Sequence, residues 1–140
     1  MEETSAYSVT QKGEGVMSTK KILLVDDSCT ARLLNRMIFS QKSNYVLISA
    51  VDGKEAVERA KREKPDLILM DIVMPRMTGL EACRVLKKDK ETERIPVILL
   101  TTRGEEQYVQ EGYASGCSDY LTKPVNDVEL LDLLKAYLGE

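Results

Sequence analysis

The stretch KILLVDDSCT, residues 21–30, decides the fold and also poses a chemical question. Its apolar run from Ile22 to Val25 is short and unbroken, which is typical of a strand buried on both faces of a parallel sheet. The run ends in two adjacent acids, Asp26 and Asp27. Because burying an unpaired charge is costly, two carboxylates at the end of a buried strand require an explanation.

Strand-like and helix-like segments alternate from this stretch to the end of the chain. Short apolar runs predict strands, and apolar residues at helical spacing predict helices. The expected strands cover residues 21–26, 45–50, 66–71, 96–101 and 120–122, and the expected helices cover residues 28–41, 55–63, 79–88, 105–113 and 126–138. Five such units predict a parallel sheet with helices on both faces and right-handed crossovers.

Two of these helices have a clear apolar face. Amphipathic helices of globular proteins turn such a face to the core. The faces consist of Leu33, Leu34, Met37 and Ile38 in the first helix, and of Val128, Leu131, Leu134 and Leu138 in the last.

Composition favours one globular domain. The chain has 140 residues, of which 43% are hydrophobic and 31% charged, and we assign the domain to residues 20–140. Residues 1–19 have few large apolar side chains and are expected to be a disordered tail. The net charge of −3 argues against nucleic-acid binding. No membrane span or signal peptide is predicted, so we expect a cytoplasmic monomer.

The cysteines and the lack of histidine exclude several kinds of site. Cys29, Cys83 and Cys117 are odd in number and widely spaced, so we interpret them as reduced packing residues. Without histidine or a CxxC pair, a zinc site is not expected. Mechanisms that use a histidine of this chain as base or phosphocarrier are excluded.

Polar residues end or follow four of the five expected strands. They are Asp26 and Asp27 after the first, Asp71 at the end of the third, Thr101 at the end of the fourth, and Lys123 after the fifth. Ligands of open parallel sheets bind outside the carboxyl ends of the strands, where the strand order reverses. We therefore expect these side chains to converge.

This set of residues suits phosphoryl chemistry. Three neighbouring carboxylates repel one another unless a cation neutralises them, and Mg²⁺ prefers oxygen ligands. We expect Asp26 and Asp27 to hold Mg²⁺, and Asp71 to ligate it and act as the nucleophile toward phosphorus. The ammonium of Lys123 and the hydroxyl of Thr101 suit the oxygens of a phosphoryl group.

Each feature also has an ordinary interpretation when taken alone. Asp27 or Ser28 can cap the following helix, and Asp71 can be a turn residue. Thr101 is common in strands, the Lys-Pro pair fits a loop, and Tyr120 fits a core. Their joint occurrence, each at the end of its own strand, is what favours a site.

A resemblance to the receiver domain of two-component response regulators is carried by four segments: ILLVDDS, DLILMDIVMPRMTG, IPVILLTT and DYLTKPV. It extends from about Lys20 to Leu138. No output domain is recognisable, so the chain is similar to stand-alone regulators of the chemotaxis type. The resemblance implies a flavodoxin-like, doubly wound α/β fold with strand order 2-1-3-4-5.

The resemblance also implies residue roles at the acidic end of the sheet. Asp71 would accept phosphate from a sensor histidine kinase. Asp26 and Asp27 would belong to the Mg²⁺ site, and the backbone carbonyl of Val73 would be a further ligand.

The remaining implied roles concern switching and output. Thr101 and Lys123 would contact the phosphoryl group, and Tyr120 matches the aromatic switch position of the family. A downstream protein target would bind the face formed by residues 105–113 and 120–138.

The resemblance also implies that three residues near the site influence its chemistry. Thr102 stands where the family often has a smaller residue, which narrows access to the phosphoryl group. Val73 and Arg103 occupy the two variable positions that influence hydrolysis, so the lifetime of the phosphoryl group is left open.

Four other functions remain as alternatives. A phosphorelay intermediate would pass the phosphoryl group onward. A magnesium phosphatase with an aspartate nucleophile often carries a D-x-D motif, whereas Asp71 is followed by Ile72 and Val73. An FMN carrier would suffer repulsion between its phosphate and the acidic loop. An interaction module independent of phosphate would bind neither Mg²⁺ nor beryllofluoride.

Overall fold

Strands and helices alternate strictly in the computed structural model, which describes residues 20–102 and 107–139. The strands are β1 (Lys21–Val25), β2 (Val46–Ala50), β3 (Leu67–Asp71), β4 (Val97–Thr101) and β5 (Asp119–Thr122). The helices are α1 (Cys29–Lys42), α2 (Gly53–Glu63), α3 (Gly79–Lys88), α4 (Tyr108–Ala114) and α5 (Asp127–Leu138). The expected tail, residues 1–19, and part of the expected fourth helix lie outside the described residues.

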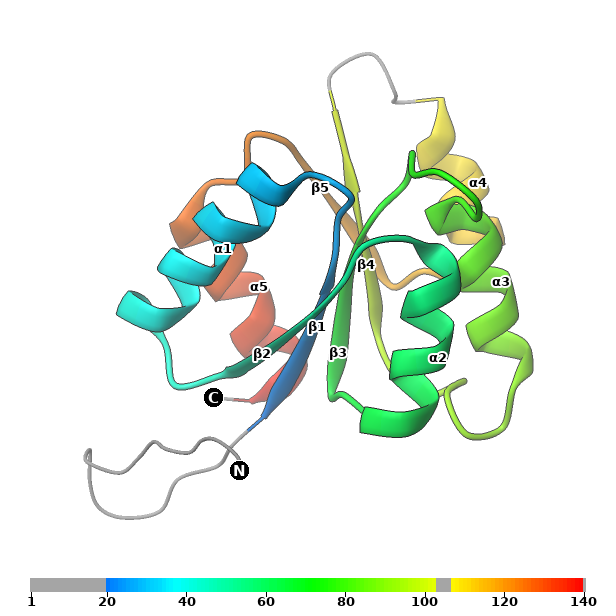
Figure 1. Cartoon of the computed structure of the whole chain (residues 1–140), viewed down its shortest axis with the longest axis horizontal. Helices are drawn as coiled ribbons and strands as arrows, with labels where there is room; N and C mark the ends of the chain where they lie inside the picture. Colours follow the sequence, from blue (N-terminus) through cyan, green and yellow to red (C-terminus); the bar gives the residue numbers. More distant parts are fainter. Residues whose placement is uncertain (1–19, 103–106, 140) are drawn as a thin grey trace.

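All neighbouring strands of the sheet run parallel, in the order β2-β1-β3-β4-β5 (Figure 1). This confirms the predicted flavodoxin-like topology. The chain leaves β1 in one direction toward β2 and returns to the other side of β1 as β3, so the strand order reverses there. Because β1 and β3 are paired, with Val25 opposite Met70, the acids that end these strands are brought side by side.

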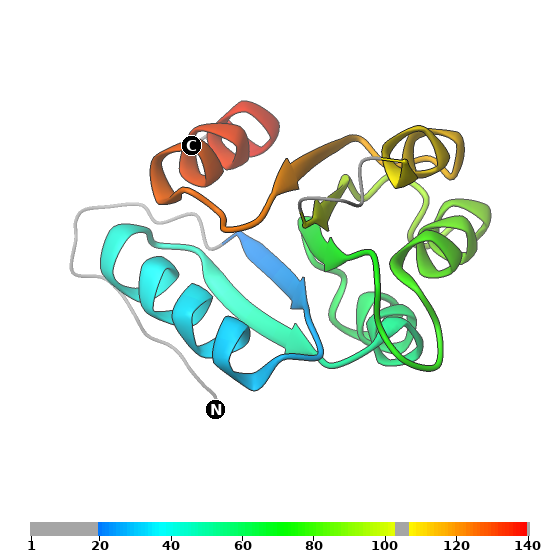
Figure 2. The same ribbon diagram turned by 90° about the horizontal axis from the view of Figure 1, so that it is seen from above.

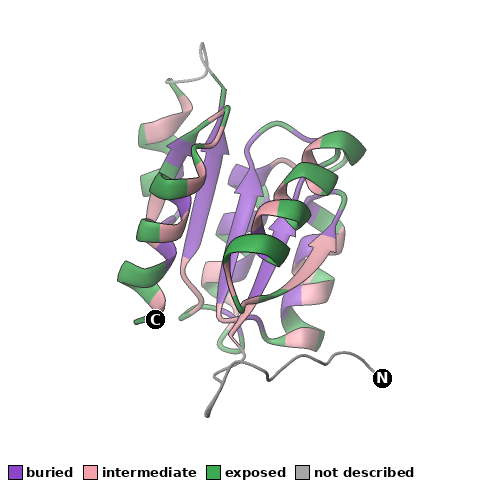
Figure 3. Cartoon of the chain, turned by 90° about the vertical axis from the view of Figure 1, so that its left-hand side faces the viewer, coloured by how far each residue is buried: buried purple, intermediate pink, exposed green. Residues whose placement is uncertain are grey.

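The helices cover both faces of the sheet. Seen from above, α1 and α5 lie on one side and α2, α3 and α4 on the other (Figure 2). Every residue of β3 and β4 is buried, which explains their unbroken apolar sequences (Figure 3). A hydrophobic core lies on each face of the sheet. The helices contribute to one core Ala56, Ala60, Leu80, Cys83 and Leu86, and to the other Phe39, Leu130 and Leu134.

Side-chain caps determine where four of the helices begin. In each case the residue before the first helical position accepts a hydrogen bond from a backbone amide of the first turn, which satisfies a group that the helix leaves free. These residues are Ser28, Asp52, Thr78 and Asn126. The ordinary interpretation of Ser28 is thus correct for that residue, and the pair Asp52-Gly53 starts a helix as expected.

The predicted core face of α1 is wrong. Leu33 and Leu34 are each 56% exposed and Met37 is 48% exposed, whereas Phe39 is the buried residue of this helix. Helical spacing identifies residues that share a face but not which face meets the sheet. In α5, Val128 is likewise exposed, and Leu130 takes a buried position instead.

The cysteine prediction holds for two residues out of three. Cys83 and Cys117 are buried and free, but Cys29 is exposed at the first position of α1 and packs in no core. Within the described part of the chain, no helix has the length and apolarity needed to cross a membrane.

Candidate functional site

Three carboxylates meet at the carboxyl end of the sheet. Asp26 and Asp27 follow β1, and Asp71 is the last residue of β3. Each offers an oxygen that lies within 4.8 Å of the oxygens of the other two. Asp26 is fully buried and Asp71 is 8% exposed, whereas Asp27 is exposed. The arrangement is an acidic pocket with one wall open to solvent.

Lys123 reaches into this pocket from the loop after β5. Its Nζ lies 2.9 Å from Asp26 Oδ2 and 2.7 Å from Asp71 Oδ1. Its amide donates to the carbonyl of Thr101, and a cis peptide joins it to Pro124. Burial disfavours the charged ammonium, but the bonds to the two acids outweigh burial and raise the pKa of Lys123.

The Asp71 carboxyl holds its proton unusually well. Burial raises its pKa from 3.8 to about 7, the ion pair with Lys123 opposes this rise, and the nearby Asp26 adds to it. One ammonium therefore does not fully compensate two buried acids. A second cation would lower the free energy of the ionised pocket.

The polar groups of Asp26 are fixed by local backbone contacts. Its Oδ1 accepts a hydrogen bond from the Ser28 amide at 2.9 Å, and its own amide donates to the carbonyl of Ala50. Arg32 Nη1 donates to the Asp26 carbonyl at 2.6 Å. Arg32 was not predicted as part of this region. Its position in the first turn of the helix after Asp26 and Asp27 could have indicated that its side chain reaches back to these residues.

Thr101 ends β4 next to the acidic pocket. It is 1% exposed, and within the described residues its hydroxyl has no hydrogen-bond partner. Thr102, beside it, is exposed, and Arg103 lies outside the described residues. A buried hydroxyl without a partner is costly, so this oxygen is suited to hydrogen-bond a ligand bound in the pocket.

Val73 and Tyr120 lie outside the acidic cluster. Val73 is 55% exposed in the loop after β3, and its role as a carbonyl ligand stays a prediction. Tyr120 is 38% exposed on β5, and its ring meets that of Tyr113 edge-on with centroids 6.2 Å apart. The tyrosine is therefore not a core residue, and its role as a switch also stays a prediction.

The residues present fit a magnesium ion. The donor set consists of carboxylate oxygens within 4.8 Å of one another, which are the ligands that hard divalent cations prefer. Burial is the main cause of the raised pKa of Asp71, and a bound cation would favour the ionised carboxylate. The exposed Asp27 leaves room for the water molecules that Mg²⁺ usually retains.

Comparison with known proteins agrees with this geometry. The model of the response regulator receiver domain family matches residues 22–135. Protein PilH of Pseudomonas aeruginosa is 43% identical over 119 residues, which cover 85% of this chain and 98% of PilH.

Two solved structures are similar as well. The chemotaxis response regulator CheY4 of Vibrio cholerae is 33% identical with a TM-score of 0.79, over 86% of this chain and all of that one. The receiver domain of the sensor histidine kinase PA1611 from Pseudomonas aeruginosa is 29% identical with a TM-score of 0.80, over 88% of this chain and all of that one. The PA1611 structure contains a magnesium ion coordinated in its active-site cleft.

Proposed function

Because this chain belongs to the response regulator receiver domain family, we propose that Asp71 accepts a phosphoryl group from a sensor histidine kinase. One observation carries the proposal: three carboxylates lie within 4.8 Å of one another, and a lysine from a distant loop contacts two of them. Asp26, Asp27 and Asp71 would hold Mg²⁺, with the Val73 carbonyl as a further ligand. The only reactions that the protein itself would carry out are its own phosphorylation and dephosphorylation.

The transfer requires an ionised Asp71. Its carboxylate oxygen forms a bond to phosphorus while the bond from phosphorus to the donor nitrogen breaks and the donor histidine leaves. Lys123, already 2.7 Å from Asp71, would donate to one phosphoryl oxygen, and the free hydroxyl of Thr101 would donate to another. Bound Mg²⁺ would neutralise charge on the phosphoryl oxygens.

Phosphorylation would act as an electrostatic switch. A phosphoryl group carries about −1.5 to −2 charges, which would draw the Thr101 hydroxyl toward Asp71 and free space for the Tyr120 ring. A swing from 1:99 to 99:1 in favour of the active state needs about 5.5 kcal/mol of differential interaction. Thr101, Lys123 and the metal would have to act together, since one hydrogen bond to a charged group contributes less than that.

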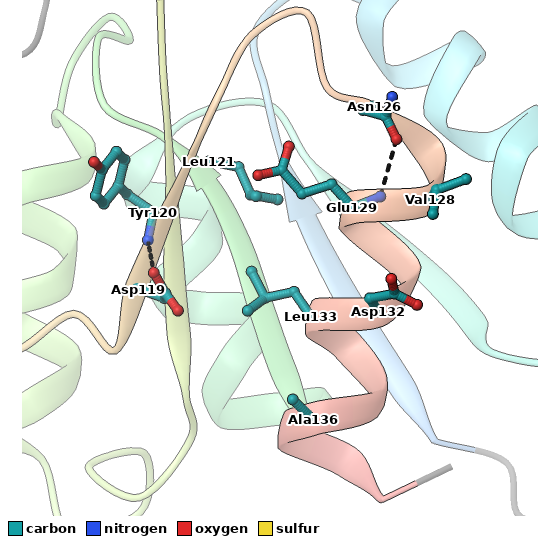
Figure 4. A pocket seen from close by; sticks show the side chains of 9 residues that line it. All are labelled: Asp119, Tyr120, Leu121, Asn126, Val128, Glu129, Asp132, Leu133 and Ala136. Carbon is teal, nitrogen blue, oxygen red and sulfur yellow. Dashed lines mark hydrogen bonds between the residues drawn. The ribbon is translucent and has the colours of Figure 1, made fainter.

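The surface of β5 and α5 is the proposed binding face for a downstream protein. A groove of about 740 Å³ lies between these elements, with Leu121 and Leu133 in its lining. Figure 4 shows Asp119, Glu129 and Asp132 around it, and among the described residues that line it there is no lysine or arginine. A target segment that places lysine or arginine beside apolar anchors would match this groove.

The pathway is proposed by likeness. PilH and the chemotaxis regulator CheY4 are similar to this chain, so we propose signalling of the motility or chemotaxis type by a cytoplasmic monomer. A phosphorelay intermediate remains the alternative, because the same pocket would serve onward transfer. Within the described residues no carboxylate stands two positions after Asp71, which gives no support to the aspartate phosphatases.

Acetyl phosphate and Mg²⁺ provide the test. We expect intact-protein mass spectrometry to show one added phosphoryl group on the wild type and none on Asp71→Asn or Asp71→Ala. Asp132→Asn, which removes an exposed acid on α5, serves as the matched control and should be phosphorylated normally. Undiminished uptake by Asp71→Asn would overturn the assignment. Turnover of a phosphate ester would favour the phosphatase, and failure to bind Mg²⁺ would favour an interaction module.

A further inference from the structure

An ion pair ties the loop between β3 and α3, residues 72–78, to the beginning of α2. Arg76 Nε donates to Asp52 Oδ2 at 2.7 Å, and Arg76 Nη2 donates to the same oxygen. Asp52 is 4% exposed, and its Oδ1 caps α2 by accepting the amide of Glu55 at 2.8 Å. One oxygen of this buried carboxylate therefore serves its own helix, and the other holds the loop.

The backbone around the ion pair is closely fitted. The Gly53 amide donates to the Met77 carbonyl at 3.2 Å, and a Cβ at Gly53 would collide with that carbonyl. Arg76 has a φ of 67°, in the left-handed region that favours glycine or asparagine. A residue with a side chain stays in this conformation only when its surroundings hold it there. The contact with Asp52 is such a restraint.

Strand pairing positions this loop only as far as Ile72, whose amide donates to the Leu100 carbonyl of β4 at 3.2 Å. The acids after β1 and at the end of β3 are held by paired strands of the sheet. Val73 lies two residues past Asp71, outside the strand, and is 55% exposed. The backbone is fixed before Val73 by the bonds of Ile72 to Leu100 and Gly79, so the direction of the Val73 carbonyl depends further on what holds the loop after it.

We propose that Asp52 and Arg76 form a clamp that positions the Val73 carbonyl toward the metal and thereby sets the affinity for Mg²⁺. The inference rests on the proposed function of the acidic pocket. Asp52 follows β2, the strand that contributes no acid to the pocket, so the clamp gives this edge strand a part in the site. Both are positioning residues, since they act through the loop rather than on the metal.

Two single variants test the clamp without removing other contacts. Arg76→Gly suits the left-handed backbone, and it opens no cavity because the Arg76 side chain is 63% exposed. Asp52→Asn retains an oxygen that caps α2 but loses the charge. Removing partners that orient metal ligands commonly weakens metal affinity about 10- to 100-fold. We expect a smaller loss here, of about three- to tenfold, because the clamp acts through the loop.

Mg²⁺ binding is measured by isothermal titration calorimetry, well below the melting temperature of every variant. In NMR spectra, the change in the carbonyl ¹³C chemical shift of Val73 that Mg²⁺ causes should be smaller in both variants than in the wild type. A general loss of stability would not reduce this change. The double variant should bind no worse than either single one, because either change already breaks the clamp. Arg76→Lys, which keeps the charge, should recover part of the affinity.

Asp127→Asn is the matched control, since it breaks the pair of Asp127 with Lys42 at the start of α5 and should leave Mg²⁺ affinity unchanged. Wild-type affinity in Arg76→Gly, or additive losses in the double variant, would overturn the clamp. A wild type that binds no Mg²⁺ would instead refute the proposed function. The two failures are therefore distinguishable.

Discussion

Lys123 Nζ lies 2.9 Å from Asp26 Oδ2, although the two residues are 97 positions apart in the chain. The same ammonium lies 2.7 Å from Asp71, so one lysine joins the ends of β1 and β3 from the loop after β5. In the absence of a metal this cation limits the repulsion between the two acids. It would also compete with a metal for them, because both cations bind the same carboxylates.

Replacing Lys123 should therefore make stability depend on Mg²⁺. Without metal at pH 8, we expect Lys123→Gln to lose about 2 kcal/mol, less than a fully buried pair would, because the lysine side chain is 23% exposed. With the ammonium gone, Mg²⁺ should bind at least as tightly as to the wild type and restore most of the loss. Urea unfolding with EDTA and with Mg²⁺ measures both effects. A loss that Mg²⁺ does not reduce would contradict this account.

Asp71 should make stability depend on pH. Its pKa of about 7 in the folded protein exceeds its ordinary value of 3.8, chiefly because of burial, so the folded state binds this proton more tightly than the unfolded chain. The stability associated with the bound proton is therefore lost as the pH rises from about 4 to about 7, and the full penalty persists above that. Asp71→Asn avoids the penalty.

Calorimetry in EDTA provides the measurement. We expect the gain in melting temperature of Asp71→Asn over the wild type to be larger at pH 8 than at pH 5. Asp132→Asn on α5 is the control and should show the same difference from the wild type at both values. Equal gains for Asp71→Asn at the two pH values would show that burial does not raise the pKa of this carboxyl.

The sheet and the acidic pocket were predictable because short-range patterns determine them. The buried parts of β1, β3 and β4 are apolar runs, and the three acids and Thr101 stand at or just past the ends of these runs. Lys123 instead follows β5, which is short and more polar. Parallel pairing then places those ends together. Which side of α1 faces the sheet was not predictable, because Phe39 and the residues that are exposed are equally apolar. The pair of Asp52 with Arg76 joins residues 24 positions apart in two loops, where no period exists to reveal it.

The exposed apolar residues of α1 lead to a stability prediction. Phe39 is 1% exposed and packs between sheet and helix, so Phe39→Ala should cost about 3–5 kcal/mol. Leu34→Ala, at a position 56% exposed in the same helix, should cost no more than about 0.5 kcal/mol. Urea unfolding of both variants makes the comparison. A large loss for Leu34→Ala with a small one for Phe39→Ala would mean that the opposite face of α1 packs on the sheet.

Replacing Thr101 should have different effects on the unphosphorylated and the phosphorylated protein. Its buried hydroxyl has no partner within the described residues, so replacing it with a methyl group of similar size removes an unsatisfied polar group. Thr101→Val should therefore leave the stability of the unphosphorylated protein unchanged or raise it by up to about 1 kcal/mol. In the phosphorylated state the hydroxyl is proposed to donate to a phosphoryl oxygen, and the valine variant lacks that bond.

Beryllofluoride, which stands in for the phosphoryl group, makes this difference measurable. We expect Thr101→Val to bind it with Mg²⁺ about tenfold more weakly, corresponding to the roughly 1.5 kcal/mol or more of a hydrogen bond to a charged acceptor. Thr101→Ser keeps the hydroxyl and should bind nearly as the wild type does. If Thr101→Val lowered the free energy of unfolding of the unphosphorylated protein by more than about 1 kcal/mol, the Thr101 hydroxyl would already have a hydrogen-bond partner. If Thr101→Val and Thr101→Ser bound beryllofluoride with equal affinity, the Thr101 hydroxyl would not contribute to binding the phosphoryl group.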